Sequence, residues 1–387
     1  MKSFITAIGT ANPDYRFPQM KIAEFMTNAV SLSRENKLKL KSLYKSSGIG
    51  YRYSVIPDFG LTKGQYQFFP NTDDLEPFPS VGHRMKVYER KALPLAISAI
   101  NNCMKNNNFC SITHLITVSC TGMYAPGLDI EIIQQLGLRK DIVRTCINYM
   151  GCYAAFNAFK LADTFCKADP NARVLIVCVE ICTIHYQKKQ TPDFLLSNAL
   201  FGDGAGAALV EGKASNNVSL SIDMFNCDIA FQGRNEMAWN ISDFGFEMAL
   251  SSYVPELIQS TVRDLTCKLL SKLELTLKNV DHFAIHPGGK KILDVIRDEL
   301  KVRTEKIKTS YEVLFDYGNM SSASILFVLQ RLLNELSKSD INKKILSLAF
   351  GPGITLESML LTVTCRSNTK KLLSVSNTGE PLTNLPL

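Results

Sequence analysis

The stretch Ala172-Arg-Val-Leu-Ile-Val-Cys-Val179 is apolar almost throughout, which is typical of a strand that is covered on both faces. A helical pattern over residues 154–165 precedes it, and Pro170 and Asn171 close that helix off. Upstream, the β-branched run at residues 114–120 is followed by a turn and then by the apolar spacing of a helix. This alternation of strands and helices predicts an α/β fold with parallel sheets between helices.

The second half of the chain shows a similar alternation of helices and strands, although its amino-acid sequence does not resemble that of the first half. The patterns predict, in order, helix 254–273, strand 282–285, helix 290–300 and strands 344–350 and 354–363. A polar stretch at residues 211–217 follows the last strand of the first half. We therefore predict two similar halves, residues 1–212 and 213–387, with a mobile tail after about residue 365.

One internal segment, residues 54–82, has no sustained period and is rich in Pro, Gly, Asp and Phe. Its aromatic residues are unusual for a disordered segment. We therefore expect a long, ordered and functional loop there.

The composition is that of an ordinary globular protein. Of the 387 residues, 46% are hydrophobic and 20% are charged, which is enough apolar material for a large core. No apolar run reaches the ~18–20 residues that a membrane span needs, and the start of the sequence has no signal-peptide core. The net charge of +7 comes without an arginine-rich or zinc-finger pattern, so we expect no nucleic-acid binding. A mild positive field would suit anionic substrates such as phosphorylated thioesters.

The eleven cysteines are scattered, odd in number and without a CxxC pair, so disulfides and zinc are poor interpretations. Only five histidines are available, and a metal cluster would have few ligands to draw on. These counts favour the reducing cytoplasm and a site without metal.

The stretch Met150-Gly-Cys152-Tyr-Ala-Ala-Phe-Asn-Ala-Phe holds the first candidate for chemistry. Gly151 permits a tight turn, and a helix of small residues begins directly after the cysteine. A thiol there faces unpaired backbone N–H groups and the positive end of the helix dipole, which favours thiolate. The alternative is a buried structural cysteine, which is what most cysteines are.

Two further motifs carry polar residues. In His286-Pro-Gly-Gly289 the histidine ends a strand, so its ring can project from the end of the sheet, where sites of α/β folds gather. In Tyr317-Gly-Asn319-Met-Ser-Ser-Ala-Ser324 an amide precedes a helix. The plainer interpretations are a core or capping histidine and an N-cap asparagine. Asn319 could instead donate a hydrogen bond to a substrate oxygen.

Cys152, His286 and Asn319 together make a coherent set. An imidazole can hold a thiolate as an ion pair, and imidazole plus amide can stabilise a developing oxyanion. Papain-like proteases use the same residue types, but there the cysteine lies near the mature N-terminus in a different local sequence. The surroundings therefore weaken the case for hydrolysis.

Two other stretches invite functional interpretations. The glycine-rich run Phe201-Gly-Asp-Gly-Ala-Gly206 leads into a predicted strand at residues 207–210 and opens no helix, so a dinucleotide fingerprint is excluded. Tight packing beside a buried site is the better account. The basic stretch at residues 37–45 is a solvated helix face by default, or it could meet the phosphates of coenzyme A.

At this point the motifs resemble type III polyketide synthases of the chalcone synthase kind. The similar stretches occur in the family's order and cover most of the chain; they are those around Cys152, Phe201-Gly-Asp-Gly, His286-Pro-Gly-Gly, Tyr317-Gly-Asn-Met-Ser-Ser and Phe350-Gly-Pro-Gly-Ile-Thr. The resemblance implies a homodimer with the five-layered αβαβα thiolase fold. It also implies acyl-CoA or acyl-ACP starters, extension by malonyl-CoA, and no cofactor or metal bound to the chain.

The resemblance also implies roles for single residues. Cys152 would be the acyl-accepting nucleophile, and His286 and Asn319 would hold the thioester carbonyl while malonyl-CoA loses CO₂. Phe201 and Phe246 would be aromatic gatekeepers. The remaining expected substrate-binding residues are Cys120, Thr121, His185, Met237, Ser321 and Gly353, and Lys41 and Lys45 would bind coenzyme A.

Departures from the plant pattern bear on the substrate. Cys120 stands where chalcone synthases usually have threonine, Ala125 replaces a methionine, His185 falls where they have a cavity threonine, and Met237 replaces a glycine. We therefore expect an aliphatic acyl starter rather than coumaroyl, and a resorcinol, phloroglucinol or pyrone product. The chain also lacks the family's usual N-terminal helix and has Asn- and Lys-rich loops. These features suggest a domain of a Steely-type hybrid, in which a type III synthase follows a fatty acid synthase.

Two alternatives remain open. A ketoacyl-ACP synthase of the initiating type shares the fold and the three polar residues, but usually has a different asparagine motif. A non-catalytic acyl-binding relative would not need to retain Cys152, His286 and Asn319 together.

Overall fold

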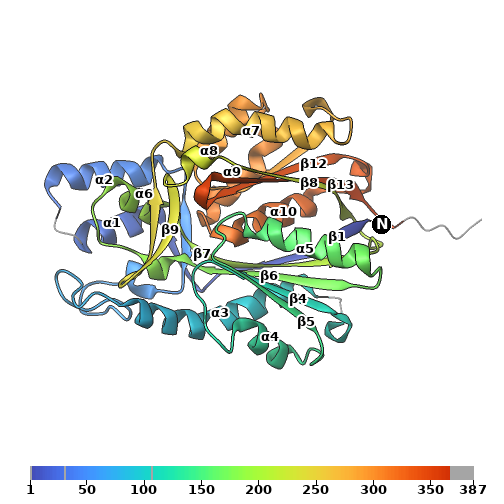
Figure 1. Cartoon of the computed structure of the whole chain (residues 1–387). Helices are drawn as coiled ribbons and strands as arrows, with labels where there is room; N and C mark the ends of the chain where they lie inside the picture. Colours follow the sequence, from blue (N-terminus) through green and yellow to red (C-terminus); the bar gives the residue numbers. More distant parts are fainter. Residues whose placement is uncertain (1, 30–31, 106–107, 367–387) are drawn as a thin grey trace, which may run out of the picture.

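The computed structural model describes residues 2–29, 32–105 and 108–366. Its body has five layers, in which two β-sheets alternate with three layers of helices (Figure 1). The predicted mobile tail lies outside the described residues from 367 onward. No helix in the described part of the chain is long and apolar enough to cross a membrane.

The first sheet contains five strands in the order β1-β7-β6-β4-β5. Their bounds are Ser3–Ala11 (β1), Asp203–Glu211 (β7), Arg173–Ile181 (β6), His114–Ser119 (β4) and Val143–Asn148 (β5). Strand β7 is antiparallel to both of its neighbours, whereas β4 runs parallel to β6 and to β5. The sheet is therefore mixed: the prediction of parallel strands holds for β6, β4 and β5, and it is wrong for β1 and β7.

The second sheet repeats this arrangement with the order β8-β13-β12-β11. Its strands are Ser219–Ile229 (β8), Thr355–Thr364 (β13), Lys344–Gly351 (β12) and His282–Ile285 (β11). Strand β13 is antiparallel to both neighbours and β11 is parallel to β12, as at the equivalent places of the first sheet. Antiparallel pairing of β1 with β8 joins the two sheets into one nine-stranded ladder. The division into halves at residue 212 stays a prediction, and the chain between β7 and β8 passes through that point.

Helices fill the middle layer and cover both outer faces (Figure 1). Between the sheets lie α5 (Ala154–Ala168) and α10 (Ser324–Glu335). One outer layer is formed by α3 (Val81–Cys103) and α4 (Leu128–Leu136), and the other by α7 (Val254–Ser271) and α8 (Lys290–Glu299). Helix α9 (Thr304–Tyr317) packs against the edge strand β11.

The position of strand β6 explains why residues 172–179 are apolar almost throughout. Val174, Ile176 and Cys178 belong to the core around the central helices. Alternate residues, among them Leu175 and Val177, belong to the core beneath α3. Successive side chains of a strand point to opposite faces, so a strand between two helical layers is apolar at every position.

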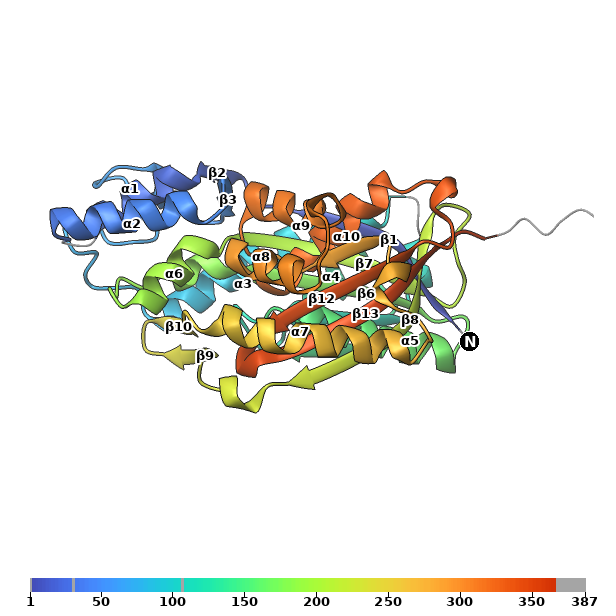
Figure 2. The same cartoon turned by 90° about the horizontal axis from the view of Figure 1, so that it is seen from above.

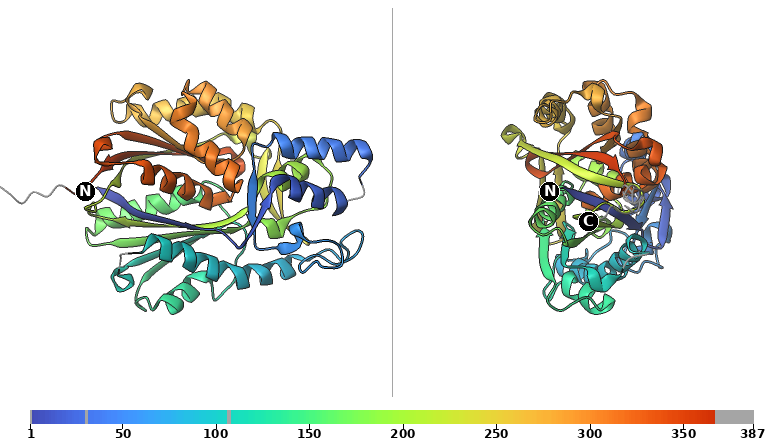
Figure 3. Two further views of the ribbon diagram at one scale, coloured as in Figure 1. Left: turned by 180° about the vertical axis from the view of Figure 1, so that it is seen from behind. Right: turned by 90° about the vertical axis from the view of Figure 1, so that its right-hand side faces the viewer.

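Smaller elements gather at one end of the layered body, away from the N-terminus (Figures 1 and 2). They are β2 (Tyr15–Pro18), α1 (Gln19–Ala29), α2 (Arg34–Ser46), β3 (Tyr51–Ser54), α6 (Pro192–Leu200), β9 (Met237–Ser242) and β10 (Gly245–Leu250). The view from behind in Figure 3 shows α1 and α2 at this same end. They cover the carboxyl ends of β4 and β6, which is where the candidate residues meet.

The loop at residues 54–82 is ordered, as predicted. Asp58 is fully buried and accepts hydrogen bonds from the backbone N–H groups of Gln67, Phe68 and Phe69 at 2.8–3.0 Å. Phe69 packs against Phe25 of α1 with ring centroids 5.6 Å apart. Buried aromatic contacts therefore hold the loop on α1.

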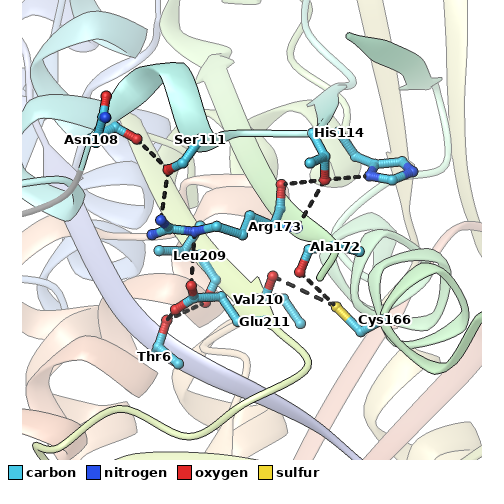
Figure 4. A network of polar contacts seen from close by, with 11 residues as sticks. Thr6, Asn108, Ser111, His114, Cys166, Ala172, Arg173, Leu209, Val210 and Glu211 are labelled. Atoms are coloured by element: carbon cyan, nitrogen blue, oxygen red, sulfur yellow. Dashed lines mark hydrogen bonds and ion pairs between the residues drawn. The ribbon is translucent and has the colours of Figure 1, made fainter. Parts of the chain in front are cut away.

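The opposite end of the first sheet is held by polar contacts (Figure 4). At the start of β6, Arg173 forms an ion pair with Glu211 of β7 at 2.8 Å and donates to Ser111 at 2.6 Å. Thr6 of β1 donates to the same Glu211 carboxylate at 2.5 Å. The starts of β6 and β1 are thereby tied to the end of β7, and the carboxyl end of β6 is left to the site.

One element differs from the sequence prediction. Strand β7 begins at Asp203, so most of the glycine-rich run lies inside the strand and not before it. A Cβ on Gly204 would lie 2.4 Å from Sδ of Met320, and a Cβ on Gly206 would lie 2.7 Å from Cβ of Leu326. These glycines let the α10 region approach β7 closely, which agrees with the predicted tight packing.

Candidate active site

Cys152 lies on the turn between β5 and α5. Gly151 has a φ of 87°, and a Cβ at this position would lie 2.2 Å from Cδ of Pro352. The glycine therefore allows both the turn and the contact with the loop after β12. Tyr153 is the N-cap of α5, so the thiol stands at the amino end of a helix, as predicted. The cysteine is buried, with 7% of its surface exposed.

Asn319 lies beside Cys152, with 4.0 Å between its Oδ1 and the cysteine Sγ. Oδ1 accepts the backbone N–H of Ser321 at 2.8 Å, and Nδ2 donates to the carbonyl of Gly288 at 3.3 Å. The amide is thus held in one orientation. It does not cap α10, whose N-cap is Ala323 and has no side-chain cap bond, so the plainer interpretation is wrong.

His286 follows the last residue of β11, as predicted, and its backbone N–H donates to Leu348 of β12 at 2.8 Å. Neither ring nitrogen has a hydrogen-bond partner among the described residues, although the side chain is only 1% exposed. A buried polar group without a partner is costly and usually has a functional explanation. The ring is therefore available to a ligand or to the thiol.

These side chains line one cavity of about 630 Å³, including its opening to solvent. Cys120, Thr121, Phe201, Met237 and Ser321 of the predicted set also line it. Sequence reasoning missed much of the wall, namely Cys182, Trp239, Met248, Leu250, Ile292 and Phe350. In the β9–β10 hairpin, Met248 pairs with Trp239 and Leu250 pairs with Met237, which presents these four side chains on one face.

Burial is the main influence on the pKa values of Cys152 and His286. Burial raises the pKa of Cys152 to about 12, the hydrogen bond with Ser321 opposes this rise, and the charge of Glu180 adds to it. Burial also lowers the pKa of His286 to about 3. Burial therefore opposes the thiolate that the end of the helix favours, and the predicted thiolate stays a prediction.

Glu180 is the main polar residue that sequence reasoning missed. It is fully buried, and it accepts the backbone N–H of Cys120 at 3.0 Å and the hydroxyl of Thr121 at 2.8 Å. Ser322 also donates to it. Burial raises the pKa of its carboxyl, and these hydrogen bonds oppose the rise. Its signal in the sequence is a single acidic residue inside the apolar run of β6.

His185 and Phe246 do not line the Cys152 cavity. Their rings stack 4.3 Å apart and line a second hollow of about 500 Å³, including its opening to solvent. Nε2 of His185 lies 2.7 Å from the carbonyl oxygen of Thr121, and Nδ1 accepts the N–H of Phe246 at 2.9 Å. Nε2 must therefore carry the proton and donate, which fixes a neutral tautomer. Through these two hydrogen bonds, His185 links β10 to the Cys120–Thr121 segment.

A groove of about 850 Å³, including its opening to solvent, adjoins the Cys152 cavity. The two share the lining residues Leu250, Gly288 and Ile292. Lys290 and Lys291 line the groove. The predicted residues Lys41 and Lys45 are exposed on α2 beside it but do not line it, and Gly353 lies in the turn next to the lining residue Pro352.

Comparison with known families agrees with this geometry. A model of the N-terminal domain of chalcone and stilbene synthases matches residues 1–214, and a model of their C-terminal domain matches residues 224–364. The chain belongs to the chalcone and stilbene synthase family. Its five-layered architecture is the thiolase-like fold of type III polyketide synthases.

Relatives of this synthase include complete enzymes and part of a much longer protein. It is 29% identical over 93% of its length to type III polyketide synthase A of Arabidopsis thaliana, of which it covers 92%. The chain is also 29% identical, over 93% of its length, to probable polyketide synthase 1 of Dictyostelium discoideum. It spans only 11% of that protein.

Two solved structures resemble this synthase closely. The C-terminal type III polyketide synthase domain of Steely1, a type I/III hybrid from Dictyostelium, has a TM-score of 0.86 at 27% identity. That match covers 94% of this chain and 99% of the domain. PKS-I of the brown alga Ectocarpus siliculosus has the same TM-score at 29% identity, over 93% of this chain and 98% of that one.

Proposed function

We propose that this type III polyketide synthase loads an aliphatic acyl starter onto Cys152 and extends it with malonyl-CoA. The main support for this proposal is that Cys152, His286 and Asn319 come from three distant segments and line one largely apolar cavity. A groove that shares lining residues with this cavity lies beside it, and we propose that a thioester on a long flexible arm enters there. The apolar wall, with Trp239, Met248 and Leu250, favours an aliphatic starter over a polar one.

Loading is a thioester exchange. The Cys152 sulfur attacks the starter carbonyl, the thiol proton passes to His286, and the coenzyme A thiolate leaves and takes up a proton. Imidazolium and thiolate attract one another, so transfer within the pair costs less than ionising either group alone. The product is an acyl-Cys152 thioester, with the active-site groups otherwise unchanged.

Extension begins with decarboxylation of malonyl-CoA. The carboxylate leaves as CO₂, and the electron pair of the broken C–C bond forms an enolate on the remaining thioester. Nδ2 of Asn319 and the His286 ring are the donors for its oxygen, which requires that the imidazole carry a proton there. The enolate carbon then attacks the carbonyl of acyl-Cys152, the C–S bond breaks, and the products are a β-ketoacyl-CoA and the Cys152 thiolate, which takes up a proton from water. No cofactor is needed, because decarboxylation itself supplies the carbanion.

Repeated extension and ring closure would give a resorcinol, phloroglucinol or pyrone. We propose the cytoplasm as the compartment, since all eleven cysteines are unpaired. A homodimer is supported by the edge strand β5, where Val143 is 49% exposed and Cys146 is also exposed. No described strand pairs with its outer edge, and free edges invite pairing with another chain.

The test is an assay of the purified chain with malonyl-CoA and a panel of acyl-CoA starters, read by mass spectrometry of the products. Cys152→Ala should abolish product while malonyl-CoA decarboxylation continues. Asn319→Ala should lower decarboxylation by about 10²–10³-fold, as expected for loss of one oxyanion donor. A single condensation that strictly requires malonyl-ACP would contradict the proposal and favour a ketoacyl-ACP synthase. Offering the starter on CoA and on ACP separates the two donors.

A further inference from the structure

Helix α2 presents a row of cationic side chains outward around one leucine. Its buried face carries Leu40 and Tyr44, which belong to the core. On another face, exposed side chains follow one another at intervals of four, three and four residues, which places them in one row along the helix; they are Arg34, Leu38, Lys41 and Lys45. Leu38 is 63% exposed. We call these four residues the α2 row, and α2 lies at the end of the body away from the N-terminus (Figure 2).

The charges of the α2 row are not balanced within the protein. Among the described residues, no acidic side chain lies within ion-pair distance of Arg34, Lys41 or Lys45. Lys39, beside the row, is instead paired with Glu35 at 2.6 Å. Helix α2 as a whole carries five cationic side chains and one acidic one. This face therefore attracts a polyanion.

The form of the α2 row favours a lipid surface over a protein or a nucleotide. The row contains no aromatic residue, and it lines neither the Cys152 cavity nor the adjoining groove. Protein interfaces usually depend on aromatic anchors that fill pockets, and the phosphates of coenzyme A would contact the lysines alone. An anionic lipid layer suits the whole row, because its headgroups attract the cations and its apolar region takes up an apolar side chain such as Leu38.

We propose that the α2 row docks the protein reversibly on an anionic lipid surface, with Leu38 entering the layer between the cationic side chains. Charge and one apolar side chain are two weak signals, so salt should reverse the binding. The same helix lines the groove beside the Cys152 cavity through Leu43, Ser46 and Ser47. A docked helix would hold that groove beside the lipid, where long-chain acyl thioesters gather. Docking itself needs no acyl transfer, so it stands apart from the proposed reaction.

Co-sedimentation of the full chain with lipid vesicles tests the docking. Vesicles of phosphatidylcholine alone are compared with vesicles that contain about 30% phosphatidylserine. Three cations near an anionic surface should raise the partition coefficient about 100-fold over neutral vesicles, since each contributes about fivefold. Raising the salt from about 0.1 M to about 0.5 M shortens the Debye length and should lower binding to the anionic vesicles at least about tenfold.

Matched variants separate the α2 row from the net charge. Arg34→Glu should lower the partition coefficient on anionic vesicles about 20-fold, because two units of charge are lost at the lipid surface. Lys86→Glu changes the net charge equally, but Lys86 is exposed on α3, and its effect should stay below about threefold. Leu38→Ser should lower the partition coefficient about tenfold. Its control is Ile130→Ser on α4, where Ile130 is 42% exposed, and this variant should bind as the unmodified chain does.

Thermal unfolding checks that each variant folds. Equal losses in Arg34→Glu and Lys86→Glu would overturn the α2 row as the docking face, and equal binding to neutral and anionic vesicles would overturn the role of charge. A chain that binds no vesicle would also overturn the proposal. Retention of that chain on an immobilised acidic carrier protein, lost in Arg34→Glu, would then assign the row to a protein partner.

Discussion

Cys152 lies in surroundings that oppose its ionisation until a substrate arrives. Its thiol is buried next to the carboxyl of Glu180, and its imidazole neighbour is buried without a hydrogen-bond partner in the described chain. Desolvation favours the neutral form of both groups, so burial makes their charged forms costly before a substrate is bound. The charges then form during acyl transfer, when an oxyanion and donors are also present.

Alkylation of the free protein tests this resting state. The pKa of Cys152 is raised, so the thiolate is the minor form at neutral pH and its fraction grows with pH. The rate of iodoacetamide labelling of Cys152 should therefore rise about tenfold per pH unit between about pH 6 and 9. A rate that is already at a plateau at neutral pH would show a preformed thiolate–imidazolium pair.

His185 should contribute to the pH dependence of stability. Burial lowers its pKa to about 3, against about 6.5 when unfolded, so below pH ~6.5 only the unfolded chain binds this proton. Its stabilising contribution is present above pH ~6.5 and is lost as the pH falls toward 3. His185→Gln should make the free energy of unfolding less dependent on pH between about 6 and 4, by about 1.4 kcal/mol per unit. Urea unfolding at several pH values measures this slope, and an unchanged slope would contradict it.

At the scale of elements, close approach between strand and helix depends on small residues. Strand β1 packs directly on α3, and a Cβ on Gly9 would lie 2.1 Å from the backbone N of Cys103. Neither backbone can move without displacing a whole element. In the β9–β10 hairpin, by contrast, register alone decides that Trp239 and Met248 share the face toward the cavity.

Gly9→Ala should therefore lower the free energy of unfolding by roughly 2–4 kcal/mol, as overpacking of a core does at its upper range. Gly82→Ala is the matched control. Gly82 lies near the start of α3, and the nearest atom to its added Cβ would be 4.0 Å away. Alanine there should stabilise the protein by about 0.5–1 kcal/mol. Denaturant unfolding compares the two, and equal effects would contradict the close contact.

At the scale of the whole molecule, the four strands of the second sheet match β1, β7, β6 and β4 of the first sheet in order and direction, and β5 has no counterpart. Helix α9 packs against the edge strand β11, whereas β5 at the other end of the nine-stranded ladder has an open edge in the described structure. Polar contacts at the start of β6 and covering elements at its end place the site at one end of this body (Figures 1 and 4).

If the open edge of β5 forms a dimer interface, a charged residue introduced on β5 should weaken the dimer. In a two-fold dimer through β5, Cys146→Lys would bring two like charges near each other across the interface. We expect this variant to be a monomer in analytical ultracentrifugation where the unmodified chain is a dimer. Ile241→Lys is the control, since Ile241 is 61% exposed on β9. A dimer that persists in Cys146→Lys would place the interface elsewhere.

The sequence by itself determined the strand–helix order and three central residues. Strand β6 is apolar from Val174 to Val179 because both its faces are buried, and this local pattern can be detected in the sequence. Cys152, His286 and Asn319 each stand beside glycines at the end of an element, which is also local information. Their meeting in one cavity confirms that these signals belong together.

Only the tertiary structure decided the rest of the site. Trp239 and Met248 carry no local signal of their place, because the register of the β9–β10 hairpin puts them there. Glu180 stands out only as an acidic residue in an apolar strand, and its contact with Cys120 depends on the packing of two strands. The same holds for His185 and Phe246, which stack in the second hollow and not beside Cys152. The charge state of Cys152 also depends on burial by other segments, which raises the pKa of the thiol and so opposes the thiolate that the local helix end favours.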